Sequence, residues 1–208
     1  MTESNAVGGF LPSTNGLHFA NRWEPGPTVR LGILDPRLVG GLGDAKNGLC
    51  GGMSWFVRER FESGQPIPAD ATNPANGSPL FKAIVRRQVR SLGFMTIPLR
   101  FWRAAAMDPA GLARRTVEKE WPRIRSEIDG GKLVMIGLIR HHGTNPMDLG
   151  RDHQVLAFGY ETEGPGGPTT IRVYDPNWPD RDDISLQLSS AGFRQSTGEV
   201  LHGVISLR

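Results

Sequence analysis

The chain has 208 residues, of which 38% are apolar and 22% charged, with 27 glycines and 16 prolines. This length suits one domain, residues 1–208, with a full hydrophobic core, and the composition excludes a disordered or fibrous protein. The net charge is +3, no apolar run approaches the roughly 20 residues that cross a bilayer, and no secretory signal is visible. The single cysteine excludes an internal disulfide, and the sequence leaves the compartment undetermined.

The first 131 residues predict an irregular arm followed by helices. Residues 1–43 are rich in Gly, Pro and Asn and contain one candidate strand at 29–34. Apolar residues at helical spacing then predict helices that cover most of 44–131. Their expected positions are 50–61, 78–93 with an N-capping Ser-Pro start, a short apolar element around 101–106, and a segment from 108 to 131.

The second half of the chain changes to a strand pattern. Runs of β-branched and aromatic residues, separated by Gly, Pro and Asp clusters, predict four strands in 132–208. They are expected at 132–139, 153–160, 170–174 and 200–207. Helices followed by consecutive strands predict an α+β fold with a C-terminal antiparallel sheet.

Positive charge is concentrated in residues 82–125, which contain eleven Lys and Arg residues and three acidic residues. Such a segment favours an acidic partner or an anionic membrane surface. We expect no nucleic-acid partner, and the sequence does not determine the oligomeric state.

The stretch 44–61 places the only cysteine, Cys50, among glycines at the expected start of a helix. Gly48, Gly51 and Gly52 would let the backbone approach a bound carbonyl. The positive end of a helix lowers the pKa of a thiol, so this position favours a nucleophile.

Two further residues could complete a catalytic triad. His153 opens one expected strand and Asp175 closes the next, so pairing of these strands as neighbours puts both side chains at one end of the sheet. A thiol nucleophile needs a base, and the base needs an acceptor that fixes its orientation. Asn177 is a rival for the acceptor role.

The loop before His153 and the turn after Asp175 supply candidate substrate contacts. His141 and His142 lie in the loop, and Trp178 lies in the turn. We expect no metal, because adjacent histidines do not readily face one ion and no usual zinc spacing is present.

Four motifs in this order resemble the papain-like cysteine peptidase superfamily, in particular the C39-like double-glycine peptidases and the YopT-type bacterial effector proteases. The matching segments are 47–53 (Asn-Gly-Leu-Cys-Gly-Gly-Met), 129–136 (Asp-Gly-Gly-Lys-Leu-Val-Met-Ile), 152–160 (Asp-His-Gln-Val-Leu-Ala-Phe-Gly-Tyr) and 173–177 (Val-Tyr-Asp-Pro-Asn).

The resemblance implies a papain-like α+β fold and a cysteine peptidase or amidase that works through an acyl-thioester on Cys50. It also implies His153 as base, Asp175 as orienting group, a peptide or protein substrate and no cofactor. Asn47 becomes the side-chain oxyanion donor, because Asp44 occupies the position of the family's usual glutamine. A catalytically inactive binding module and an acyl or amine transferase of transglutaminase-like type remain alternatives.

Overall fold

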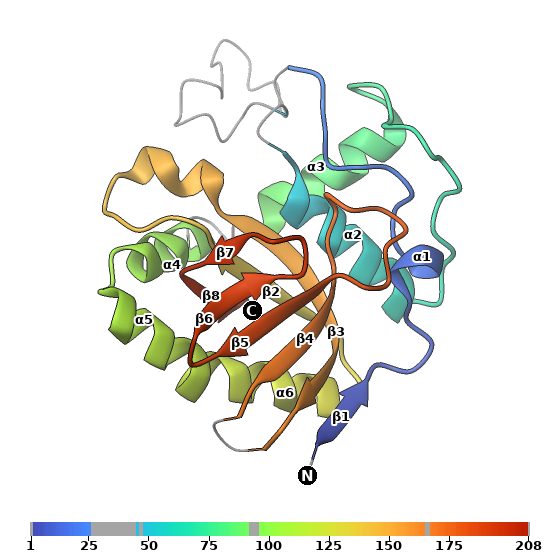
Figure 1. Cartoon of the computed structure of the whole chain (residues 1–208). Helices are drawn as coiled ribbons and strands as arrows, with labels where there is room; N and C mark the ends of the chain where they lie inside the picture. The colour runs from blue at the N-terminus through green and yellow to red at the C-terminus, as the bar shows by residue number, and fades with distance from the viewer. Residues whose placement is uncertain (1, 26–44, 46–47, 92–95, 165–166, 208) are drawn as a thin grey trace.

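A curled antiparallel sheet forms the centre of the fold (Figure 1). The computed structural model describes residues 2–25, 45, 48–91, 96–164 and 167–207. Within these ranges eight strands form one sheet in the order β7-β6-β5-β4-β3-β2-β8, and β1 pairs with β3. Their bounds are β1 (Glu3–Ala6), β2 (Val134–Ile139), β3 (His153–Thr162), β4 (Thr169–Tyr174), β5 (Ser185–Ser189), β6 (Gly192–Gln195), β7 (Val200–Leu201) and β8 (Gly203–Ser206).

Strand β3 organises the sheet because three strands pair with it. Its first half pairs with β2, its second half pairs with β1, and β4 occupies the other edge. Nearly every residue of β3 is buried, which its run of apolar residues favours. The pairing places His153 opposite Leu138 and brings the start of β3 close to the end of β4.

The helices lie between β1 and β2 in the chain and in the loop before β3. They are α1 (Pro12–Asn15), α2 (Cys50–Glu62), α3 (Pro79–Ser91), α4 (Thr96–Ala105), α5 (Pro109–Arg115), the π-helical η4 (Thr116–Glu120), α6 (Trp121–Asp129) and the 3₁₀-helical η5 (Pro146–Arg151). Asp108 caps α5 by accepting a 2.8 Å hydrogen bond from the Gly111 N–H. In the described ranges, no helix has the length and apolar character needed to cross a membrane.

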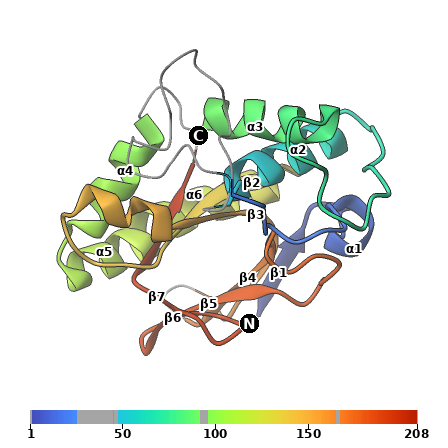
Figure 2. The ribbon, with the colours of Figure 1, turned by 90° about the horizontal axis from the view of Figure 1, so that it is seen from above.

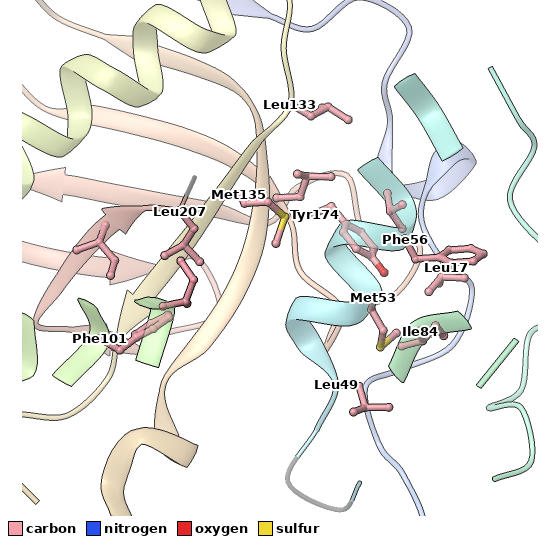
Figure 3. Packing of buried hydrophobic residues seen from close by; sticks show 14 of the residues in the cluster. Leu17, Leu49, Met53, Phe56, Ile84, Phe101, Leu133, Met135, Tyr174 and Leu207 are labelled. Atoms are coloured by element: carbon pink, nitrogen blue, oxygen red, sulfur yellow. The ribbon is translucent and has the colours of Figure 1, made fainter. Parts of the chain in front are cut away.

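One hydrophobic cluster fills the space between α2, α3, α4 and one face of the sheet. Figure 3 shows Met53 and Phe56 of α2 near Ile84 of α3, with Met135 of β2 and Tyr174 of β4 to their left. These side chains are 0–2% exposed. Helix α2 is therefore held from both sides, and its first turn has a fixed position.

Another cluster lies on the opposite face, inside the curl of the sheet. Ile124 and Ile128 of α6 pack there with Val155 of β3, Ile171 of β4 and Leu186 of β5. Figure 2 shows α2 and α3 on one side and β4 to β7 on the other. Alternate residues of β3 thus serve different cores, as the two-residue period of a strand requires.

The expected papain-like α+β fold is wrong. A helical half resting on four C-terminal strands was expected, but the sheet is larger, recruits a strand from the N-terminal arm and curls around a second core. Strands β1, β5 and β6 were missed because they are short and largely polar. The single strand expected at 200–207 is divided into β7 and β8 at His202.

The helix predictions were more accurate. Helices α2 and α3 begin and end within two residues of their expected bounds, and the expected element around 101–106 forms the end of α4. The segment 108–131 contains α5, η4 and α6. The candidate strand at 29–34 lies outside the described residues.

Candidate active site

Cys50 is the first residue of α2, and its side chain is half-buried. The Met53 N–H donates to the Leu49 carbonyl oxygen at 2.9 Å and closes the first turn of the helix. The Leu49 N–H donates to Asn21 Oδ1 at 2.6 Å. As the first helical residue, Cys50 has a backbone N–H with no acceptor within its own helix.

Gly51 and Gly52, which follow Cys50, allow close helix packing. A Cβ atom on Gly51 would lie 2.7 Å from Gln154 Oε1, and one on Gly52 would lie 2.4 Å from the Ile84 carbonyl oxygen of α3. Gly48 differs, because its φ of +91° is in the left-handed region that favours glycine. The first turn of α2 is therefore in close contact with α3 and β3.

His153 begins β3 and is 3% exposed. Its Nε2 lies 2.6 Å from Asp175 Oδ1, so Nδ1 is the ring nitrogen left for the Cys50 thiol. Burial by itself would lower the pKa of His153, but the negative charges of Asp175 and Cys50 outweigh it and raise that pKa to about 9.

The pKa of the Cys50 thiol is shifted in the complementary direction. Burial would raise it, but the charge and hydrogen bond of His153, with the backbone N–H groups of Gln154 and Gly51, lower the pKa below the ordinary value of a free thiol. Both shifts favour the same protonation state, a thiolate beside an imidazolium.

Asp175 follows β4 and is 1% exposed. Its Oδ1 also accepts a 2.8 Å hydrogen bond from the Asn177 N–H, and its Oδ2 accepts one of 2.6 Å from Gln195 Nε2. Burial would raise the pKa of the carboxyl, but the positive charge and hydrogen bond of His153, with these two donors, lower it. Gln195 lies in β6, which had no recognisable strand pattern, so no sequence signal marked this contact.

Asn177, the rival orienting residue, lies farther from the imidazole. Its Nδ2 is 3.4 Å from His153 Nε2, against 2.6 Å for the Asp175 carboxylate. Its Oδ1 accepts a 3.2 Å hydrogen bond from Asn21 Nδ2, and the Asn21 N–H donates to the Pro176 carbonyl oxygen. Asn21 therefore joins the turn before Cys50 to the turn after Asp175, and no sequence pattern marked it.

Trp178 is 41% exposed and lines a surface pocket of about 460 Å³ next to the triad. The pocket reaches the triad through two of its lining residues, Asn177 and Gln195. Its other lining residues are Arg22, Arg140, Thr197 and Glu199. Because neither Cys50 nor His153 lines it, the pocket adjoins the Asp175 side of the triad.

The two loop histidines are placed differently. His141 is buried, with Nδ1 3.0 Å from Asp152 Oδ1, so it is not on the surface where a substrate contact was expected. His142 is exposed, and its ring centroid lies 6.3 Å from that of His202. Among the described residues, no three His, Cys, Asp or Glu side chains converge on a possible metal position.

The proposed oxyanion donor cannot be placed in this site. Asn47 and Asp44 lie outside the described residues. The Cys50 N–H is thus the donor candidate that the described part of the chain supplies.

Comparison of the chain with protein-family models, with curated proteins and with solved structures finds no match. The resemblance to papain-like peptidases remains a prediction from four short motifs. Independently of this resemblance, the structure holds the half-buried thiol of Cys50, the imidazole of His153 and the buried carboxylate of Asp175. The charge of the imidazole favours an ionised thiol, and the carboxylate contacts the imidazole.

Proposed function

We propose that the protein is a thiol hydrolase that cleaves a peptide or other amide through Cys50. The observation that carries the proposal is the 2.6 Å contact between the buried carboxylate of Asp175 and His153 Nε2, which leaves Nδ1 for the thiol. A base oriented by a carboxylate and paired with a thiol is the arrangement that thiol nucleophiles require.

The reaction would proceed in two halves. The Cys50 thiolate attacks the carbonyl carbon, and the oxyanion is stabilised by the Cys50 N–H at the positive end of α2. The imidazolium of His153 gives its proton to the leaving amine, and a thioester remains on Cys50. A water molecule then loses a proton to His153 and attacks the thioester, which releases the acid and the thiol.

Two alternative functions use the same fold: an acyl transferase and a binding module without catalysis. An amine in place of water would make the protein an acyl transferase. A binding module with a structural Cys50 would need neither a lowered pKa of the thiol nor a raised pKa of His153, and both shifts support catalysis.

The first test is the rate of alkylation of Cys50 by iodoacetamide as a function of pH. The chain has one cysteine, so the adduct is unambiguous. We expect a plateau that extends below pH 6 in the wild type and is lost in His153→Ala. Asp175→Asn, which keeps the shape of the side chain, should slow the reaction at pH 6 by about tenfold or more, since one pKa unit corresponds to a factor of ten.

Asp180→Asn is the matched control, because Asp180 is an exposed carboxylate of the same turn region that pairs with His18. Its profile should follow that of the wild type. A rate that rises with a midpoint near the free-thiol pKa of about 8.5 in all four proteins would refute the proposal.

A second measurement separates hydrolase from transferase. Intact-mass analysis after mixing with p-nitrophenyl acetate should show one acetyl group, absent from Cys50→Ala. Added glycinamide should leave acetate as the main product of a hydrolase, whereas predominant N-acetylglycinamide would assign the transferase reaction. No acetylation of the wild type would count against both.

A further inference from the structure

A second, larger cavity of about 770 Å³ lies away from the proposed active site. His153 is the first residue of β3, whereas Thr162, the last, lines this cavity. The walls come from the helical segment α5–η4–α6 on one side and from the tips of the β3–β4 and β5–β6 hairpins on the other. Its volume is within the range of about 300–1,000 Å³ typical of small-molecule sites.

The base of the cavity is apolar. Leu188, Phe193 and Leu201 belong to the core inside the curl of the sheet and also line the cavity, and Trp121 lines it from α6. Val117 lines it from η4 and is 41% exposed. Protein interiors are close-packed, so a large concave space with apolar walls suits an apolar ligand.

The π-helical turn η4 places Val117 toward this space. Thr116 Oγ1 exchanges hydrogen bonds with the backbone of Val204, and the buried Glu120 accepts from the N–H and hydroxyl of Ser206. Both ends of η4 are thus bound to β8, while Val117 between them is exposed at the cavity. π-Turns inside helices occur frequently at functional sites.

Two arginines, one histidine and one glutamate line the cavity. Arg114, Arg125 and His202 line it, against Glu118. Arg125 is paired with Glu3 and Asp129. Arg114 and Glu118 are both exposed. Arg114 makes no hydrogen bond or ion pair with any residue in the described part of the chain, so its guanidinium is free to pair with an anionic ligand.

We propose that this cavity binds an amphipathic carboxylate, with the apolar chain along Val117, Phe193 and Leu201 and the carboxylate at Arg114. The proposal does not depend on the thiol chemistry at Cys50. It identifies a ligand site at the other end of β3 for molecules of the fatty-acid type.

The test is calorimetric titration of the full chain with three probes that each carry a twelve-carbon chain. Dodecanoate and dodecyltrimethylammonium are used below their micellar concentrations, and dodecanol below its solubility limit. We expect dodecanoate to bind most tightly. Arg114→Gln should weaken the binding of dodecanoate by about tenfold, because a charge-assisted hydrogen bond is lost. The affinity for dodecanol should not change. Arg194→Gln removes an exposed arginine of β6 that does not line the cavity and is the control.

A second variant tests the apolar wall. Val117→Glu places a charge against the chain of the ligand and should weaken both dodecanoate and dodecanol by at least about tenfold. Val89→Glu is the matched control, since Val89 is 51% exposed on α3 and does not line the cavity. Tighter binding of the ammonium probe, equal effects of variants and controls, or saturation only above the micellar concentration would each overturn the proposal.

Discussion

Two buried carboxylates near the proposed nucleophile differ in their partners. Both carboxylate oxygens of Asp175 have donors. Oδ1 contacts His153 Nε2 and accepts from the Asn177 N–H, and Oδ2 accepts from Gln195 Nε2. The pKa of Asp175 is lowered as a result. Gln195 is itself fixed by Thr197, whose hydroxyl donates to Gln195 Oε1 at 2.9 Å, so it positions the carboxylate without contacting the thiol.

Asp152 has donors on one oxygen alone. Its Oδ1 accepts from the Arg140 N–H and lies 3.0 Å from His141 Nδ1, whereas Oδ2 is buried without a partner in the described part of the chain. Burial therefore dominates and raises the pKa of Asp152 to about 6, although the Arg140 N–H and the charge of His141 act in the opposite direction. Asp175, with three donors, has a lowered pKa, and Asp152, with two, has a raised pKa.

The raised pKa of Asp152 predicts a pH-dependent stability. The folded state keeps the proton up to about pH 6, while the unfolded chain releases it near 3.8. The folded state binds more protons in this window, so the free energy of unfolding falls as pH rises from about 4 to about 6. Between pH 4 and pH 6 the free energy of unfolding of the wild type should fall by roughly 1–3 kcal/mol relative to that of Asp152→Asn. Urea unfolding at each pH measures this difference.

The comparison of slopes isolates the titration from the other effects of the substitution, because the asparagine side chain has the same size as aspartate and does not titrate. Asp182→Asn, at an exposed residue of another loop, provides the control. Parallel pH profiles for wild type and Asp152→Asn between pH 4 and 6 would show that the carboxyl of Asp152 titrates normally.

At the scale of elements, the contact between α2 and α3 holds the nucleophile in place. Gly52 is pressed against the backbone of α3, and its N–H donates to Gln88 Oε1 at 2.6 Å. Gly51 lies against Ser91 at the end of α3 and against the Gln154 side chain of β3. The first turn of α2 thus depends on two neighbouring elements.

Gly52→Ala should separate the two helices. The new Cβ would lie 2.4 Å from the Ile84 carbonyl oxygen, which is backbone and cannot rotate away. Overpacking of this kind typically costs about 1–3 kcal/mol of unfolding free energy, and we expect slower alkylation of Cys50 because the turn moves relative to His153. Urea unfolding and the alkylation rate at pH 6 measure the two effects.

Gly150→Ala is the control, since a Cβ at Gly150 meets no atom within 4 Å in the described part of the chain. It should change neither quantity. If Gly52→Ala were as stable and as reactive as the wild type, helix contact would not fix the thiol.

The elements also show how far the sequence determines the fold. Helices α2, α3 and α5 were predictable because apolar spacing, Ser78-Pro79 and Asp108-Pro109 are local signals. The number of strands, their order and the curl depend on pairing between distant segments, which no local pattern contains. The expected papain-like α+β fold failed for that reason.

In the candidate site, too, some residues could be predicted from the sequence and others could not. His153 and Asp175 were expected together because neighbouring strands joined by a short loop put the start of one beside the end of the next. Their catalytic roles stay predictions. Gln195 and Asn21 could not be foreseen, since they come from elements whose sequences gave no signal.

For the whole molecule, charge is distributed less simply than the basic segment 82–125 suggested. Arg87, Arg115, Arg123 and Arg125 pair with acidic residues. Three cations of α3 remain on one exposed face, four residues apart, without an ion pair in the described ranges: Lys82, Arg86 and Arg90. An acidic polypeptide would find its counter-charges along α3.

Removal of these charges should weaken binding to an acidic chain. We expect poly-glutamate to bind at low salt and to be released as the salt concentration rises. The triple variant Lys82→Gln, Arg86→Gln, Arg90→Gln should bind about tenfold more weakly, if each exposed charge contributes a few tenths of a kcal/mol to about 1 kcal/mol.

The control has the same loss of charge elsewhere: Lys132→Gln, Arg181→Gln, Arg194→Gln. Fluorescence anisotropy of labelled poly-glutamate measures the affinities. Equal weakening in both triple variants would indicate attraction by net charge, without a docking face on α3.

The Asn21 contacts have a consequence for the order in which the chain folds. They connect residues 28 and 156 positions apart in the sequence, at Leu49 and Asn177. Contacts between such distant segments close late, because the loop between them must first lose its conformational freedom. During refolding, helix α2 should therefore form before its thiol becomes reactive. Pulse alkylation of Cys50 during refolding would test this order.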